Sequence, residues 1–185
     1  MHNYLIEKLP LVCAWIEETL NHHTPNSCSV KDFVSIQKFH RLPHYFTDGF
    51  LSRAKVVLVE KVPKPPLSSM GLSMFESFEK ADVAGTTYKD TYFIKRQNCF
   101  DESLHFHELV HVVQWDYLGI EKFLLAYALG LINHGYVNSP LEVMAYGLQQ
   151  YFIQNPGLFA VEDIIRSELD TIMPSILDNA FKGKL

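Results

Sequence analysis

Cysteine, basic residues and long apolar runs are all scarce in this sequence. Its 185 residues include only Cys13, Cys28 and Cys99, with no C-x-x-C spacing, so neither a disulfide framework nor a cysteine-based zinc site is indicated. Lysine and arginine number 16 against 21 aspartates and glutamates, which gives a net charge of −5. Without a basic stripe to neutralise phosphates, a nucleic-acid partner is not expected, and the three cysteines fit a reducing compartment.

Patterns for crossing or reaching a membrane are scarce as well. The most apolar stretch, residues 123–132, is about half of the roughly 20 residues that a membrane-spanning helix needs. At the N-terminus, Glu7, Lys8 and Pro10 interrupt the apolar residues, which is not the pattern of a secretory signal peptide. We therefore expect a cytoplasmic protein with no membrane partner.

The composition is that of one globular domain. With 48% hydrophobic and 20% charged residues, a chain of 185 residues can bury roughly 70% of its unfolded surface. No repeat or long linker divides it, so we predict a single domain over 1–185. A valine-rich strand is predicted at 54–62 and a hairpin at 83–95, turning at Lys89-Asp90, which places the strand-containing part at about 50–96.

Helical spacing dominates the rest of the chain. The apolar residues of the first twenty recur at steps of three and four, which predicts an amphipathic helix, split or kinked at Pro10. After the hairpin, helices are predicted at 101–117, 120–133 and 140–154, and one or two more at 159–182. Pro174 is expected to interrupt this last region. The fold class is therefore α+β: mainly helical, with a small mixed or antiparallel sheet packed on the helix at 101–117.

The residues that carry chemistry lie in the middle of the chain. Nine histidines are present, and residues 107–111 read His-Glu-Leu-Val-His, the H-E-x-x-H pattern, within a predicted helix. Because residues four apart share a helical face, His107 and His111 can bind one Zn²⁺ at roughly 2.0–2.1 Å. Glu108 lies about 100° around the helix axis, where its carboxylate can reach a metal-bound water rather than the metal.

A catalytic zinc needs a third protein ligand, and Glu142 is the best candidate. It lies in the first turn of the helix predicted at 140–154, which can pack back beside the motif helix. Ser139 and Pro140 also form the pattern of an N-terminal capping box with Glu142. Its carboxylate is therefore either a zinc ligand or a helix cap.

Two other histidines are close enough in sequence to compete with Glu142. His105 is two residues before His107 and so points about 200° around the helix, which argues against it. His134, in the turn before the Glu142 helix, is not excluded by geometry. The same turn offers His134 and Tyr136 as hydrogen-bond donors to the oxygen that becomes negative during hydrolysis of a carbonyl compound.

Two segments carry a resemblance to a known family. They are HELVHVVQ at residues 107–114 and GY…PLE..AY at residues 135–146, and the similarity spans residues 83–153. Together they resemble the zincin-like metallopeptidases, and more narrowly small bacterial zincin-like proteins. The resemblance implies a zincin-like fold. It also implies that His107 and His111 are the zinc-binding histidines, that Glu142 is the third ligand and that Glu108 is the general base.

The chain also departs from zincin patterns. Thermolysin-like zincins usually carry an aspartate four residues beyond the third ligand, where Tyr146 stands here, and the metzincin continuation is missing because Gln114 and Gly119 are out of register. Gln114, Asp116 and Tyr146 are the candidates to orient the zinc histidines. The strand predicted at 91–95 resembles the edge strand along which zincins align a peptide.

The sequence therefore predicts a zinc-dependent metallopeptidase acting on a peptide or protein. Zinc with three protein ligands lowers the pKa of its bound water toward roughly 7, and Glu108 can take the proton as the water attacks a carbonyl. The alternative is a non-catalytic zinc-binding or scaffold protein, which the missing aspartate favours. A di-iron carboxylate protein is disfavoured, because the pairs Glu102/His105 and Glu108/His111 share one helix.

Overall fold

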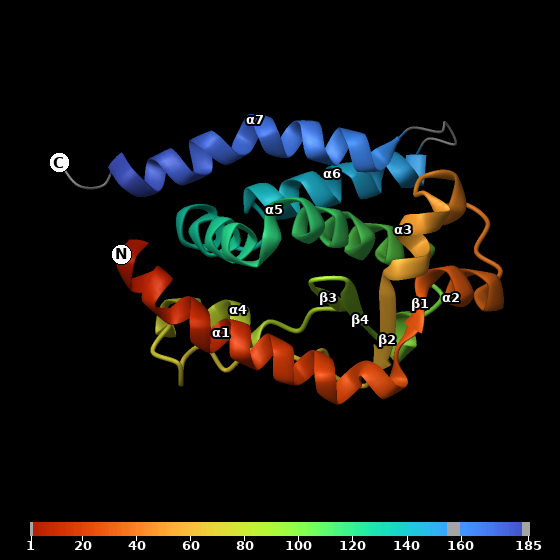
Figure 1. Cartoon of the computed structure of the whole chain (residues 1–185), viewed down its shortest axis with the longest axis horizontal. Coiled ribbons are helices and arrows are strands. Elements are labelled where there is room, and N and C mark those ends of the chain that lie inside the picture. Colours follow the sequence, from red (N-terminus) through yellow and green to blue (C-terminus); the bar gives the residue numbers. More distant parts are fainter. Residues whose placement is uncertain (1, 155–159, 183–185) are drawn as a thin grey trace.

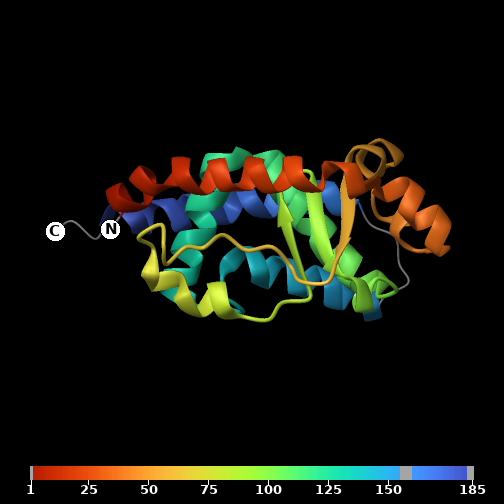
Figure 2. The same ribbon diagram turned by 90° about the horizontal axis from the view of Figure 1, so that it is seen from below.

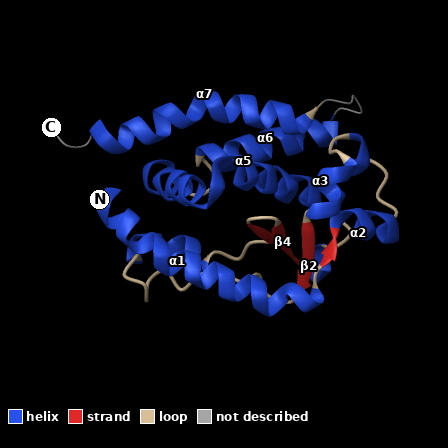
Figure 3. Cartoon of the chain, viewed as in Figure 1, coloured by secondary structure: helices blue, strands red, loops and turns tan. Residues whose placement is uncertain are grey.

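The computed structural model describes residues 2–154 and 160–182 and has an α+β fold (Figures 1 and 3). Its helices and strands are, in order, α1 (His2–His23), β1 (Cys28–Ser29), α2 (Val30–Gln37), α3 (Asp48–Arg53), β2 (Lys55–Val59), α4 (Glu76–Lys80), β3 (Gly85–Tyr88), β4 (Thr91–Lys95), α5 (Glu102–His134), α6 (Pro140–Gln154) and α7 (Val161–Lys182). The prediction of a mainly helical α+β fold with a small sheet is confirmed.

The strands form one mixed sheet in the order β1-β2-β4-β3. The predicted hairpin is present, since β3 pairs antiparallel with β4 and Lys89 takes a φ of 58° in the turn between them. The strand β4 also pairs in parallel with β2 along its whole length. The prediction of an edge strand at 91–95 is therefore wrong, because β4 has a neighbour on each side. The outer strands of the sheet are β1 and β3, and β3 is the one that pairs with β4.

Two strand boundaries differ from the predictions. The strand predicted at 54–62 ends at Val59, because its parallel partner β4 ends directly opposite, at Lys95, and leaves residues 60–62 without a ladder. The short strand β1 lies outside the predicted strand region of 50–96 and pairs antiparallel with the start of β2. Because β1 has only two residues, it is too short to show the alternating pattern of a strand, and only its pairing with β2 defines it.

Asp101 is the N-cap of the helix α5. The carboxylate of Asp101 accepts hydrogen bonds from the backbone N–H groups of Ser103 and Leu104. The helix bends at Gly119, whose φ of 71° and ψ of 169° are open at low cost only to glycine. The helices predicted at 101–117 and 120–133 are thus the two parts of one bent element.

Prolines do not interrupt the helices in which they lie. Helix α1 continues through Pro10, so it is not split there, and α7 continues through Pro174, contrary to the interruption predicted at that residue. Both Pro10 and Ile6, whose carbonyl loses its helical donor, are exposed, so water can satisfy that carbonyl. Residue 159, where the last helical region was predicted to begin, lies outside the described residues.

The first part of α5 lies in the centre of the molecule. In Figure 1, α1 and α7 run along opposite long sides, with α5 and the sheet between them. As predicted, the sheet packs on the motif helix through β3 and β4, and every residue from His105 to Trp115 is buried. The hydroxyl of Tyr4 on α1 donates to the carbonyl of Gly71 at 2.6 Å, so the segment 60–84 reaches the first part of α1 (Figure 2). Of the described helices, none is long and apolar enough to span a bilayer.

We expect Gly119→Ala to lower the free energy of unfolding by about 1–3 kcal/mol, because the bend requires a backbone conformation that is strained for an L-residue. A Cβ at Gly119 meets nothing within 4 Å, so a steric clash does not contribute. Gly147→Ala is the matched control, since Gly147 lies within α6 and also has nothing within 4 Å. This variant should be neutral or stabilised by about 0.4–1 kcal/mol. Urea denaturation of both variants measures the difference, and equal effects would contradict the assignment of the bend.

Candidate metal centre

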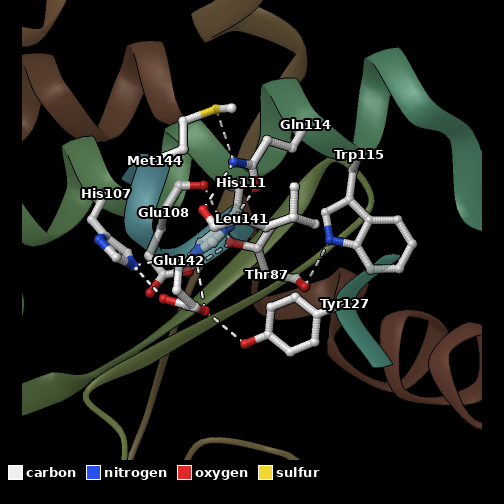
Figure 4. A network of polar contacts seen from close by, with 10 residues as sticks. All are labelled: Thr87, His107, Glu108, His111, Gln114, Trp115, Tyr127, Leu141, Glu142 and Met144. Atoms are coloured by element: carbon white, nitrogen blue, oxygen red, sulfur yellow. Dashed lines mark hydrogen bonds and ion pairs between the residues drawn. The ribbon is translucent and has the colours of Figure 1, made fainter. Parts of the chain in front are cut away.

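Two helices bring three predicted ligand side chains together (Figure 4). His107 and His111 project from α5, and Glu142 projects from the first turn of α6. One ligand atom of each lies within 4.8 Å of the others, and no second group of this kind is found in the described part of the chain. The exposed fractions of His107, His111 and Glu142 are only 4%, 5% and 2%. The three side chains therefore form a buried cluster.

The spacing of the three side chains suits one metal ion. The Nε2 atoms of His107 and His111 are 3.2 Å apart. The carboxylate oxygens of Glu142 lie 3.5 Å from Nε2 of His107 and 3.4 Å from Nε2 of His111. Ligands at roughly 2.0–2.1 Å from a tetrahedral Zn²⁺ lie about 3.3–3.4 Å from one another. In addition, Oε2 of Glu142 is buried and accepts no hydrogen bond within the described residues. The donor set thus fits a zinc ion.

The structure argues against one of the two interpretations of Glu142, the helix cap. Its carboxylate faces the histidines of α5 (Figure 4). The Oγ atom of Ser139 is buried without a hydrogen-bond partner among the described residues, so the capping box is not formed. Helices α5 and α6 approach closely here, since a Cβ on Gly130 would lie 2.4 Å from that Oγ atom. Close helix contact, rather than capping, places Glu142 at the cluster.

The electrostatics of the cluster favour positive charge beside Glu142. Burial alone would lower the pKa of His111, but the carboxylates of Glu142 and Glu108 and the hydrogen bond to Gln114 together outweigh burial and raise this pKa to about 9. Burial likewise opposes ionisation of Glu142, but the two histidines hold its pKa well below the usual value. A buried carboxylate needs a compensating charge. A proton on His111 or a metal cation between the three side chains can supply it.

Gln114 orients His111. It is one of the three residues that the sequence offered as partners for the motif histidines. Its Oε1 atom lies 2.8 Å from Nδ1 of His111, so the Nδ1–H donates to it and Nε2 faces the cluster. The amide nitrogen of Gln114 in turn donates to the carbonyl of Leu141, at 3.1 Å. Hydrogen bonds of this kind fix the tautomer of a metal-binding histidine and raise its basicity. Gln114 therefore couples His111 to the helix that carries Glu142.

The other two candidates for orienting a histidine have different positions. Asp116 pairs with Arg53 at 3.0 Å on the surface and faces away from the cluster. The ring of Tyr146 packs against that of His107, with centroids 4.5 Å apart. The Nδ1 atom of His107 has no hydrogen-bond partner within the described residues. Tyr146 thus supports His107 by packing.

Glu108 is held against the outer strand of the sheet. The hydroxyl of Thr87 on β3 donates to Oε2 of Glu108 at 2.7 Å, and Nε1–H of Trp115 donates to the carbonyl of Thr87 at 3.1 Å (Figure 4). Burial raises the pKa of Glu108, although the neighbouring histidines partly oppose this. A Cβ on Gly85 would lie 2.4 Å from Oε1 of Glu108, so glycine is required for this approach. No sequence pattern pointed to Thr87 or Gly85, since strand pairing places them beside Glu108.

Tyr127 is a further residue of the site that sequence reasoning missed. Its hydroxyl donates to Oε1 of Glu142 at 2.6 Å. It reaches Glu142 because α5 bends at Gly119 and brings its second part beside α6. A signal was present: Tyr127 is the one hydroxyl-bearing residue in the apolar run 123–132, and a buried tyrosine hydroxyl needs a partner.

The two candidates for stabilising an oxyanion are placed differently. Tyr136 lines the same pocket as His107 and Glu108. Burial raises the pKa of Tyr136, so it stays protonated and can donate. His134 is the last residue of α5, is exposed, and is not among the residues that line the pocket. The structure thus brings Tyr136 to the site and leaves His134 at the surface.

The first E-x-x-H pair has a structural role. His105 is buried between the hydroxyl of Tyr92, at 2.9 Å, and the carbonyl of Cys99, at 3.1 Å. Burial lowers the pKa of His105 to about 4, which keeps the ring neutral. The carboxylate of Glu102 accepts hydrogen bonds from the backbone N–H groups of residues 41 and 42. The described residues thus give no support to a di-iron centre.

Comparison of the chain with protein-family models, with curated proteins and with solved structures finds no match. Function therefore has to be inferred from the geometry of the site.

We expect Tyr127→Phe to weaken zinc binding about 10- to 100-fold, because Glu142 loses the hydrogen bond that orients its carboxylate. Competition with a chromophoric chelator measures the affinity. Tyr117→Phe is the matched control, because Tyr117 donates to Asp170 on the surface. It should leave the affinity unchanged, whereas His111→Ala should abolish binding. A Tyr127→Phe variant with unaltered affinity would show that Glu142 needs no such support.

Proposed function

We propose that the protein is a zinc-dependent metallopeptidase with a zincin-like fold. The observation that carries this proposal is the convergence of both motif histidines and Glu142 in one buried cluster, with the carboxylate of Glu108 lining the same pocket. Two histidines and a glutamate with a second, unligated glutamate are the residues that zinc-assisted hydrolysis uses. A cluster that served only to bind metal would not need Glu108 in a buried position.

Each residue has a distinct role in this proposal. His107, His111 and Glu142 would hold the zinc ion. When bound, zinc supplies Lewis acidity, which lowers the pKa of a coordinated water and polarises a peptide carbonyl. Glu108 takes a proton from the attacking water and passes it to the leaving amine. Burial raises the pKa of Glu108, which makes its carboxylate a stronger proton acceptor than a solvated glutamate.

The outer strand β3 is the element suited to align a peptide. Its residues Gly85 to Tyr88 line the pocket that contains Glu108, and one edge of β3 has no strand partner within the described residues. An extended peptide can add to such an edge through main-chain hydrogen bonds. The hydroxyl of Tyr136 in the same pocket is the proposed donor to the oxygen that becomes negative.

A structural zinc site is the second candidate, and the burial of the cluster favours it. The four site residues have exposed fractions between 2% and 5%, which is typical of a site closed to solvent. In this case zinc would stabilise the packing of α5 against α6, and chelation would lower the melting temperature without affecting any reaction.

We expect Glu108→Gln to abolish peptide hydrolysis while zinc stays bound, because the amide cannot accept the proton but keeps the size of the side chain. The measurement is cleavage of a proteome-derived peptide library by mass spectrometry, together with zinc content by elemental analysis. Glu121→Gln, at an exposed position of α5, is the control and should retain activity. Cleavage by the Glu108→Gln variant would refute the mechanism, and stoichiometric zinc without cleavage by the wild type would favour the structural site.

Gly85→Ala tests the position of Glu108 without changing its chemistry. The new methyl group would lie 2.4 Å from Oε1 of Glu108 and 3.1 Å from the carbonyl of Phe93, so the carboxylate or the strand must move. We expect at least a tenfold loss of kcat with zinc content unchanged, since an error of about 1 Å in a reacting group costs about 100-fold. Gly49→Ala, where a Cβ meets nothing within 4 Å, is the control. Equal kcat values for the two variants would argue against a catalytic Glu108.

A further inference from the structure

A pocket extends from the metal centre to the N-terminal helix. It has a cavity volume of about 110 Å³. The four site residues His107, Glu108, His111 and Glu142 all line it and are buried. Other lining residues, among them Leu9 on α1 and Leu124 on the second part of α5, are half-exposed. The pocket therefore joins the site to the surface between these two helices.

The walls of the pocket are mostly apolar, and most come from outside the motif region. Helix α1 contributes four aliphatic side chains, Leu5, Leu9, Val12 and Ile16. The segment 65–83 adds aliphatic and aromatic side chains, and the second part of α5 adds a further apolar set that includes Ala128. The apolar stripe of α1 thus forms one wall of the pocket.

The charge and size of the pocket restrict its occupant. Beyond the site itself, Lys8 is the one charged residue among the described residues that line it. A charged group of the occupant would lose its hydration among these apolar side chains, and an acidic group would also face the carboxylates of Glu108 and Glu142. Apolar cavities of about 150 Å³ stay dry and take up benzene, so a cavity of about 110 Å³ suits a single compact apolar group.

We infer that this pocket holds one apolar side chain of the substrate, of leucine or phenylalanine size, next to the bond on which Glu108 acts. The inference rests on the proposed peptidase function and adds the substrate class: peptides with a compact apolar residue beside the cleaved bond. Helix α1 is then part of the specificity pocket, although it lies far from the motif in sequence.

Binding of the side chain can be tested apart from catalysis. Toluene, which represents the phenylalanine side chain, is titrated into the full-length protein with and without zinc, and the fluorescence of Trp115 in the pocket lining reports occupancy. We expect saturable binding of toluene and at least tenfold weaker binding of benzoate and benzylamine. Ala128→Phe fills the pocket and should weaken toluene binding at least tenfold. Ala14→Phe, at an exposed position of α1 outside the lining, should leave it within twofold.

The peptide preference provides the second measurement. In the zinc-loaded wild type, kcat/KM should be at least tenfold higher for peptides with leucine or phenylalanine beside the cleaved bond than for those with aspartate or lysine there. Ala128→Phe should shift this preference toward alanine and glycine. If Ala128→Phe does not fold, Leu9→Phe in the lining and Leu11→Phe on the exposed face of α1 form a second matched pair.

The two measurements separate this inference from the proposed function. Saturable toluene binding that Ala128→Phe abolishes, without cleavage of any peptide, would retain the apolar pocket and refute the peptidase. Cleavage without an apolar preference would retain the peptidase and overturn the inference. The inference would also be overturned if toluene bound without saturation, or if it bound equally well to the Ala128→Phe and Ala14→Phe variants.

Discussion

The burial of the Glu142 carboxylate is the constraint on which the rest of the structure depends. With an exposed fraction of 2%, this anion has little hydration, so the protein must provide charge and hydrogen bonds in place of water. Two imidazoles of α5 and the hydroxyl of Tyr127 surround it. Removing such partners from a buried charge typically costs about 3–5 kcal/mol. Helices α5 and α6 are therefore joined by electrostatics as well as by packing.

Holding this cluster in place requires contacts from elements that are distant in sequence. The indole of Trp115 and the hydroxyl of Thr87 connect the motif helix to the sheet and fix Glu108 from that side. At the other end of the molecule, the carboxylates of Glu102 and Glu162 accept hydrogen bonds from backbone N–H groups of residues 41–47 and join that loop to α5 and α7. The N-terminal half of the chain thus closes the core around the site, although it supplies none of the three ligands.

How much of the site could be predicted depended on whether the information was local. His107 and His111 are four residues apart on a helix, so helical geometry alone places them together, and Glu142 follows from its position in the first turn of the next helix. Tyr127 was missed because its position depends on a bend at Gly119. The edge strand was assigned to β4 instead of β3, since a hairpin pattern does not show which strand meets β2. A local cue existed: Tyr92, Phe93 and Ile94 of β4 are consecutive, bulky and buried, which is typical of a central strand.

The covering of the site by α1 has a consequence for its chemistry. The apolar stripe of α1 and the segment 65–83 replace water on one side of Glu108 and Glu142, and electrostatic interactions are stronger in a medium of low dielectric constant. The same desolvation raises the pKa of Glu108, which an open site would leave closer to that of a solvated glutamate. In the proposed peptidase, desolvation and access would oppose each other, because a peptide would have to enter where apolar side chains exclude water. An apolar side chain of the proposed substrate would resolve this conflict, since it could occupy the pocket and keep water out while the polar backbone reaches His107, His111, Glu142 and Glu108.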